Sequence, residues 1–329
     1  MRRNHFYLLL LSLIFLCCGM WLLSLMNGAV AFNAATIHSA LFAFEPTDQA
    51  EQIIRNIRLP RLVSGFLVGS SFAVSGALMQ GVTRNPLADS GLLGINSGAA
   101  LGLTVSFILF PVHSSQAAFF FSLGGACVVT LIIFLILLTS RQRITPVRLI
   151  LVGVAISSFF TALSQVLALT FNLQQDLSFW YVGGVAAITW QALVPLLPIY
   201  LLSMLVSLVI SSQINCLVMG DEAAVSIGKK PNRIRFYALS FNTVLAGIAV
   251  SLVGPVGFIG LIVPHVLRRW TGENYRQLIP LCIFGGGLLV MSADFCARMI
   301  NPPFETPFGL LIAVIGVPFL LAKVRGVRG

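Results

Sequence analysis

The sequence predicts an all-α, polytopic membrane protein with ten transmembrane helices. Its mean hydropathy is +0.96, and 57% of its residues are hydrophobic. Only 9% of the residues are charged, whereas soluble domains carry about 25% charged residues. The apolar residues gather in long runs, and a chain of 329 residues has room for about ten spans of ~20 residues each.

The apolar runs define the order of the predicted spans. The first run follows Met1-Arg2-Arg3 and is longer than a signal-peptide core, so we predict that it is a retained span. Spans 2–5 and 7–10 begin on opposite sides of the membrane, which allows an inverted repeat within one domain covering 1–329. The ten spans are predicted at residues 6–28, 60–81, 92–110, 117–139, 147–170, 189–211, 236–256, 258–270, 278–300 and 305–323.

The basic residues test this topology. Ten spans put both termini on one side of the membrane, which we take as the cytoplasmic side. With this orientation, 16 of the 20 lysines and arginines lie on the cytoplasmic side, in agreement with the positive-inside rule. The outer basic residues are Arg55, Arg58, Arg61 and Arg298.

A polar segment at about 212–235 separates the sixth and seventh spans. Gly220 and Gly228 bracket a stretch that can be helical, Asp221–Ile227, and its two acids fall in the first turn, where they complement the helix dipole. Four basic residues follow it. A small surface helix on the basic side of the membrane is suited to binding another protein, and an ordinary cytoplasmic loop is the alternative interpretation.

Three of the outer arginines lie at the ends of predicted spans. Arg58 and Arg61 flank Leu59-Pro60 at the start of the second span, and Arg298 follows Asp294 by four residues at the end of the ninth. One interpretation is an outward basic patch for an acidic partner, because complementary charges steer encounter and fix register. The other is local, with an i,i+4 ion pair between Asp294 and Arg298 and with Arg58 extending to the interface.

The segment Gly254–Gly260, followed by Val263-Pro264-His265, predicts a broken helix. Irregular backbone at membrane depth is tolerated where protein or a water-filled cavity surrounds it. His265 is a candidate proton relay or ligand, and a hydrogen-bonded histidine near a helix end is the alternative.

Several motifs of enzymes and of ion-coupled carriers are missing. The sequence has no phosphate-binding loop of its own and no zinc-protease or nucleophile-elbow motif. No span carries a series of acidic residues of the kind that proton-coupled carriers use. We therefore expect no enzyme activity, no bound cofactor or metal and no nucleic-acid partner. A passive conduit that a partner drives needs none of these groups.

Four ordered motifs then carry a family resemblance, and together they cover the chain nearly end to end. They are Arg58–Gly102, Gly220–Gly228, Gly254–Arg268 and Ala293–Leu321. They resemble the permease subunits of ABC importers for iron–siderophore complexes, haem and vitamin B12. The resemblance implies the type II ABC importer permease fold, an identical or homologous permease as partner, and a substrate path along the interface between the two subunits.

The resemblance also implies further partners and their docking sites. Two ABC ATPase subunits, which bind ATP and Mg, would dock on the cytoplasmic coupling helix. An extracytoplasmic substrate-binding protein would dock through Arg58, Arg61 and Arg298. An inner gate would lie at Thr145-Pro146-Val147, where relatives often carry small polar residues. The matched coupling residues are Gly220, Asp221, Glu222, Ala223, Ala224, Val225, Ser226, Ile227 and Gly228.

We therefore expect the permease subunit of an ATP-driven importer in a bacterial inner (cell) membrane. A ferric siderophore is the first expectation for its cargo, followed by haem and cobalamin. ATP hydrolysis would belong to a separate subunit. An ion-coupled secondary transporter is the alternative from a different functional class.

Overall fold

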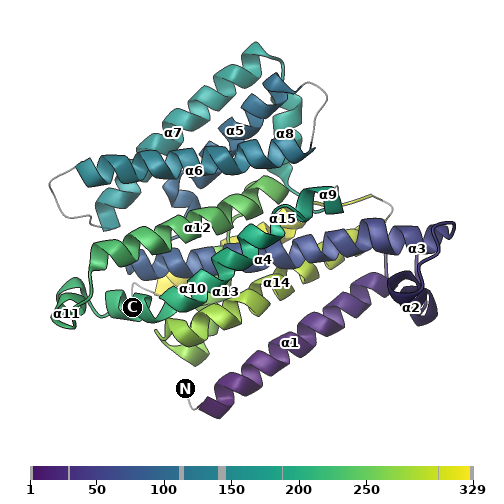
Figure 1. Cartoon of the computed structure of the whole chain (residues 1–329), viewed down its shortest axis with the longest axis horizontal. Coiled ribbons are helices and arrows are strands. Elements are labelled where there is room, and N and C mark those ends of the chain that lie inside the picture. Colours follow the sequence, from purple (N-terminus) through teal and green to yellow (C-terminus); the bar gives the residue numbers. More distant parts are fainter. Residues whose placement is uncertain are drawn as a thin grey trace.

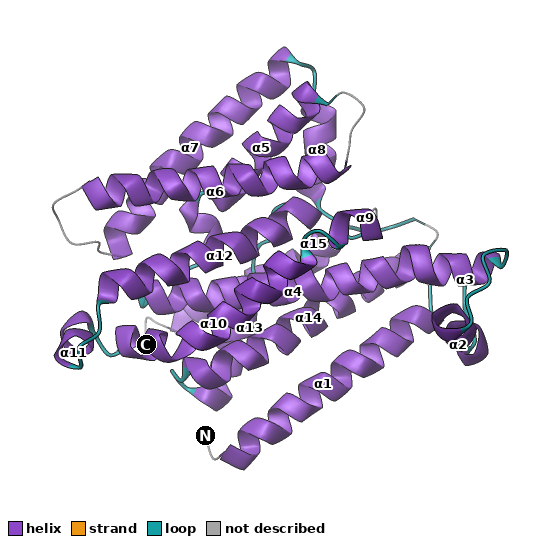
Figure 2. Ribbon diagram, viewed as in Figure 1, coloured by secondary structure: helices purple, strands orange, loops and turns teal. Residues whose placement is uncertain are grey.

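The computed structural model describes residues 3–28, 30–110, 115–139, 146–186, 188–302 and 304–326, and every regular element in these ranges is helical (Figures 1 and 2). The elements are α1 (Arg3–Met26), α2 (Ala34–Phe42), α3 (Gln49–Ile53), the π-helical turn η1 (Ile54–Arg58), α4 (Leu59–Thr83), the 3-10 turn η2 (Ser90–Leu93), α5 (Ile95–Leu109), α6 (Ser115–Thr139), α7 (Pro146–Thr170), α8 (Gln174–Val182), α9 (Trp190–Leu193), α10 (Leu197–Val218), α11 (Asp221–Ser226), α12 (Pro231–Val253), α13 (Ile259–Thr271), α14 (Tyr275–Ile300) and α15 (Phe308–Gly326).

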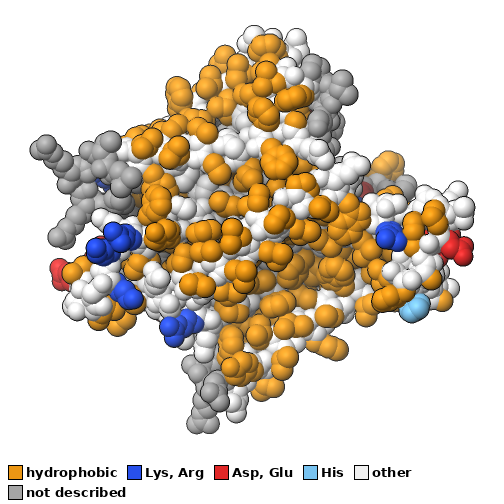
Figure 3. Space-filling view, in the orientation of Figure 1, with side chains coloured by type: hydrophobic (Ala, Val, Ile, Leu, Met, Phe, Trp, Pro, Cys, Tyr) orange, Lys and Arg blue, Asp and Glu red, His pale blue; other side chains and the backbone are white. Residues whose placement is uncertain are grey.

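The long helices form one bundle with two distinct ends. The α11 end, at the left of Figure 1, also holds the start of α1 and the end of α15. The α2 end, at the right, holds α2, α3 and α9. Hydrophobic side chains cover the middle of the face shown in Figure 3, and several Lys and Arg side chains gather near the α11 end. This distribution is the one expected of a chain whose middle lies in a bilayer.

The helix count agrees with the predicted ten spans. Within the described residues, seven helices are long and apolar enough to cross a membrane, and two shorter apolar helices, Ile95–Leu109 and Phe308–Lys323, accompany them. The 13-residue helix α13 occupies the eighth predicted span. Nine of the ten helices begin and end within a few residues of their predicted bounds.

The sixth span is the exception, because α10 begins later and ends later than predicted. Trp190–Leu193 forms the separate short helix α9, and Pro198 is the second residue of α10, where its fixed φ suits a first helical turn. The helix then continues through its polar C-terminal residues. Asn215 explains this extension, since its Oδ1 accepts a 2.7 Å hydrogen bond from the backbone N–H of Tyr275 at the start of α14. The connection between α10 and α12 is therefore short and consists mainly of α11.

Helix α4 is the centre of the bundle. The apolar window of this helix is 89% buried, and the helix packs against α10, α12, α13 and α14. Glycines make this close packing possible, because a Cβ atom added at Gly69 would overlap the backbone oxygen of Gly286 on α14. One added at Gly76 would overlap the backbone oxygen of Gly260 on α13. Small residues at such positions let helix backbones approach closely.

The packing of α4 has a counterpart in the second half of the chain. Helix α4 packs along α14, α12 packs along α6, and α4 and α12 contact each other. Exchanging spans 2–5 for spans 7–10 maps these contacts onto one another. The arrangement is compatible with the inverted repeat, which stays a prediction.

The predicted break between the seventh and eighth spans is present. Helix α12 ends at Val253 and α13 begins at Ile259. Gly254 has φ +75°, and a Cβ atom there would overlap the backbone oxygen of Trp180 on α8. Protein therefore surrounds the break, as irregular backbone in a membrane requires. The ring of His265, further along α13, packs edge-on against Phe319 of α15 at a centroid distance of 5.5 Å.

Candidate functional site

The short helix α11 protrudes at its own end of the bundle (Figure 1). It covers Asp221–Ser226, and its flanking glycines have the backbone angles that the sequence pattern suggests. Gly220 has φ +120° and Gly228 has φ +75°. Both values lie in the region that favours glycine. The two glycines therefore let the chain leave α10, form the six-residue helix α11 and re-enter the bundle as α12.

Asp221 faces the bundle and anchors α11. Its Oδ1 atom accepts a hydrogen bond from Nη2 of Arg84 and another, at 2.7 Å, from Nη2 of Arg235 on α12. Burial raises the pKa of Asp221, but the hydrogen bond and charge of Arg235, together with the charge of Arg84, outweigh this effect and hold the pKa below its usual range. The carboxylate therefore stays charged and keeps both partners.

The opposite side of α11 is exposed and partly apolar. Met219, Val225 and Ile227 are 75%, 60% and 58% exposed. Glu222 and Ser226 are exposed beside them, whereas Ala224 is fully buried and Ala223 lies between the two extremes. We call the exposed set Met219, Glu222, Val225, Ser226 and Ile227 the handle surface. Exposed apolar side chains with a polar rim are typical of protein contact sites.

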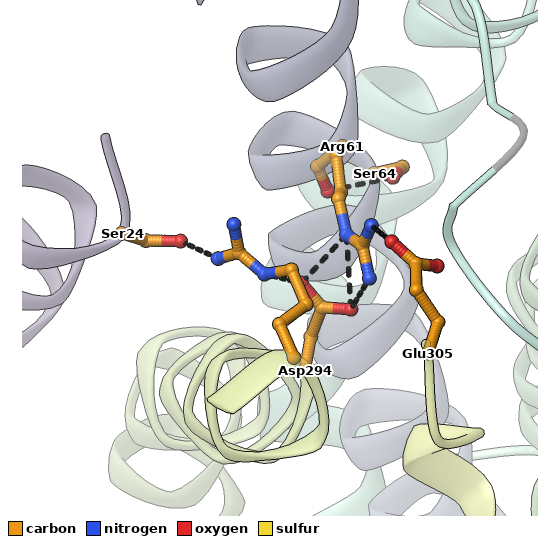
Figure 4. A network of polar contacts seen from close by, with 6 residues as sticks. Ser24, Arg61, Ser64, Asp294 and Glu305 are labelled. Carbon is orange, nitrogen blue, oxygen red and sulfur yellow. Dashed lines mark hydrogen bonds and ion pairs between the residues drawn. The ribbon is translucent and has the colours of Figure 1, made fainter. Parts of the chain in front are cut away.

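The three arginines predicted for partner docking are largely buried in this chain. Arg58 and Arg61 are 6% and 7% exposed, and the side chain of Arg298 is 10% exposed. Arg61 lies between two carboxylates (Figure 4): its Nη2 atom is 2.8 Å from Oδ1 of Asp294, and its Nη1 atom pairs with Oε1 of Glu305. The structure therefore does not present these arginines as an open basic patch.

The other two arginines hold α1 against the bundle. Nε of Arg298 lies 3.4 Å from Oδ2 of Asp294, which is the local i,i+4 pair predicted as the alternative. Nη2 of Arg298 donates to Oγ of Ser24 in α1. The guanidinium of Arg58 donates to the backbone oxygens of Leu25 and Val30.

Glu305 is the member of this cluster that sequence reasoning missed. Its side chain is 45% exposed, whereas those of Arg61 and Asp294 are 8% and 5% exposed. A small cavity of about 170 Å³ lies beside it, lined among others by Arg61, Gly183, Gly184, Asp294, Glu305 and Thr306. Its position at the start of the predicted last span, at the same end of the molecule as the outer arginines, was the available signal in the sequence.

The predicted gate is only partly visible. Thr145 lies outside the described residues, and Pro146 is the first residue of α7. Val147 is 67% exposed. Helix α7 continues with further exposed apolar side chains, namely Leu151, Val154, Phe159, Leu163, Val166 and Leu169. Lipid or a second subunit must cover this face of α7 in a membrane. Within the described ranges, no group of three His, Cys, Asp or Glu side chains is placed to hold a metal ion.

Comparison with known proteins extends over nearly the whole chain. The FecCD transport family matches residues 13–325. The iron(3+)-hydroxamate import system permease protein FhuB of Bacillus subtilis (strain 168) is 39% identical over 320 residues, which cover 97% of this chain and 83% of that protein. The Fe(3+) dicitrate transport system permease protein FecC of Escherichia coli (strain K12) is 33% identical over 312 residues, covering 93% and 92%.

A solved structure has the same fold. It shows a metal-chelate type ABC transporter in an inward-facing conformation, and it superimposes with a TM-score of 0.84 at 27% sequence identity. The superposition covers 96% of this chain and 98% of that one.

Proposed function

The chain belongs to the FecCD transport family, and we propose that it is the permease subunit of an ATP-driven importer of ferric chelates. Its fold is that of the type II ABC importer permeases. The observation that carries the proposal is the end-to-end similarity, at 39% identity, to a permease named for iron(3+)-hydroxamate import. A second relative is named for Fe(3+) dicitrate transport. A ferric siderophore or ferric citrate is therefore the first cargo to test, before haem and cobalamin.

A single copy supplies half of the path in this proposal. The exposed apolar face of α7, which begins at Pro146 and Val147, lies against a second permease subunit, identical or homologous. The cargo passes between the two subunits through weak, multiple contacts.

Two ATPase subunits, which bind ATP and Mg, dock on the handle surfaces of the two permeases. The apolar side chains of Met219, Val225 and Ile227 supply buried contact area, and Glu222 contributes a charge at the rim. The α11 end is then cytoplasmic, together with both chain termini. This orientation agrees with the excess of basic residues at that end.

A substrate-binding protein docks at the α2 end. Arg58, Arg61 and Arg298 are already paired within the chain, so an acidic partner must compete for them. Glu305 is the exposed competitor, since Arg61 is its ion-pair partner. We infer that docking replaces the Glu305–Arg61 contact by a carboxylate of the binding protein and leaves the buried Arg61–Asp294 pair in place.

Reconstitution tests this function directly. The chain is co-expressed with the candidate second permease and ATPase, purified as a complex and placed in proteoliposomes with a loaded binding protein. Uptake of radioactive iron as ferric hydroxamate or ferric citrate should require ATP and the ATPase. Iron uptake that proceeds without any ATPase, and that collapses when an ionophore removes the proton gradient, would contradict the proposal and support an ion-coupled carrier.

A further inference from the structure

Arg84 occupies the point where three helices meet. It follows the last residue of α4 and has φ +52° and ψ +32°, a left-handed conformation that is uncommon for a residue other than glycine. This conformation accompanies two contacts of its side chain. Nε donates a 2.7 Å hydrogen bond to the backbone oxygen of Leu217 at the end of α10, and Nη2 pairs with Asp221 at the start of α11.

Both contacts suit the helix ends that they join. A cation is favourable at a helix C-terminus, where backbone oxygens lack partners, and an acid is favourable in a first turn. The Leu217 carbonyl and the Asp221 carboxylate lie on the two sides of the Gly220 turn. The guanidinium of Arg84 therefore bridges the turn through which α11 leaves α10.

Arg235 holds Asp221 from the other side. This residue of α12 is 4% exposed, and its Nη2 atom donates to Asp221 at 2.7 Å. A buried arginine needs its counter-charge, because an unpaired buried charge costs far more than the pair contributes. Asp221 is therefore committed to contacts within the chain. Its neighbour Glu222 is exposed and belongs to the handle surface. The two adjacent acids therefore have different roles, Asp221 within the chain and Glu222 on its surface.

Helix α4 runs from this junction through the bundle to its other end. It runs for 25 residues, about 37 Å at 1.5 Å per residue. At its far end Arg61 is ion-paired with Asp294 and Glu305. One buried helix thus connects the anchor of α11 with the arginine cluster at the α2 end.

We propose that Arg84 and Arg235 are positioning residues that hold α11 on the ends of α4 and α12 through Asp221, so that a displacement of α11 moves α4 as a rigid body. The proposal rests on the proposed function, because it assigns the route by which a docked ATPase moves the permease. Rigid-body movement of packed helices is a common form of such transitions.

The first experiment measures coupling in the complete importer. Arg84→Gly is the informative variant, since glycine adopts a left-handed φ readily and the change removes the guanidinium without adding backbone strain. We expect the number of ATP molecules hydrolysed per chelate imported to rise about tenfold, the factor expected when a charge-assisted contact is lost. Arg84→Lys, which keeps the charge, should restore most of the coupling. Arg276→Gln, at an exposed arginine at the start of α14, is the matched control.

A double-mutant cycle separates the anchor from general damage. Arg84→Gly combined with Asp221→Asn should lower the coupling by less than the sum of the two single effects, because each single change already removes the contact between these two side chains. Arg84→Gly combined with Glu222→Gln should instead give effects that add. Additive effects for the Arg84 and Asp221 pair would overturn the proposal.

The second experiment needs only this chain in its membrane. Ala224 is fully buried on α11, so a cysteine there reports release of the helix. Ala224→Cys is labelled with a membrane-impermeant maleimide in inverted vesicles, and the signal of the six native cysteines is subtracted by using the chain without the added one. Arg84→Gly should raise the labelling rate about tenfold, and Arg276→Gln should leave it unchanged.

The two experiments fail in different ways. If the wild-type complex shows no ATP-dependent uptake, the proposed function fails, and the labelling rate still tests the anchor. If uptake requires ATP but Arg84→Gly changes neither the coupling ratio nor the labelling rate, the proposed function stands and the role of Arg84 is overturned.

Discussion

Nη2 of Arg61 lies 2.8 Å from Oδ1 of Asp294, and this ion pair joins the central helix α4 to α14. Nε of the same arginine lies 3.1 and 3.0 Å from the two carboxylate oxygens. The side chains of Arg61 and Asp294 are 8% and 5% exposed. Removing one partner of a buried pair leaves an uncompensated charge, which costs about 3–5 kcal/mol.

Asp294→Asn should therefore lower the free energy of unfolding by several kcal/mol, because it leaves Arg298 without its charge partner and leaves Arg61 with the partly exposed Glu305 alone. Thermal unfolding in detergent, followed by the fluorescence of the tryptophans, measures the effect. Arg55→Gln is the control, because Arg55 is exposed at the same end. Equal unfolding temperatures for the two variants would show that the pair contributes no stability.

The contact between Gly76 and Gly260 predicts a second effect on stability. Gly76→Ala places a Cβ atom onto the backbone oxygen of Gly260, which cannot move out of the way as a flexible side chain could. Forcing extra volume into a packed core costs about 1–3 kcal/mol, and we expect at least this loss with separation of α4 from α13. Gly124→Ala is the matched control, since a Cβ atom at this helical glycine meets no atom within 4 Å. Thermal unfolding of the two variants should differ by several degrees, and a difference of zero would contradict this packing.

The anchor of α11 predicts a dependence on pH. Because the pKa of Asp221 is held below its usual range in the folded chain, its contribution to stability is complete above the unfolded carboxyl pKa of about 4 and is lost as the pH falls through the folded value. The unfolding temperatures of wild type and Asp221→Asn should differ by a constant amount between pH 5 and 8, by the same linkage, and should converge below about pH 4. A difference that grows on acidification would have the wrong sign for this assignment.

The positions of the spans could be predicted from the sequence, because each is a long apolar run. In a bilayer such a run forms a helix, which satisfies its own backbone hydrogen bonds. The same reasoning failed at α10, whose last turns carry Ser211 and Asn215. These polar residues resemble a loop, but Asn215 is paired with the first residue of α14, more than fifty positions away. The glycines around α11 were recognisable because the required backbone angles are a local property.

The burial of the outer arginines could not be predicted in the same way. The sequence shows Arg61 beside no acid, and its two carboxylate partners lie more than two hundred positions later in the chain. The i,i+4 spacing of Asp294 and Arg298 was visible, but it did not indicate that Arg61 shares the same carboxylate. The sequence also did not indicate which of the two adjacent acids, Asp221 or Glu222, anchors α11. That choice depends on the tertiary fold, because only the fold brings Arg84 to Asp221.

The exposed carboxylate of Glu305 provides the test for partner docking. If a binding protein inserts its own carboxylate at Arg61, Glu305→Gln removes the competing charge but keeps the shape of the side chain. We expect the affinity for the loaded binding protein to rise by about three- to tenfold, in line with the loss of one partly exposed competing ion pair. Surface plasmon resonance on the permease in nanodiscs measures this affinity. Glu45→Gln is the control, because it makes the same charge change at an exposed acid near the α2 end. Raising the salt concentration should weaken binding in every case, because rim charges are screened. Unchanged or weaker binding for Glu305→Gln would assign Arg61 to the internal network alone.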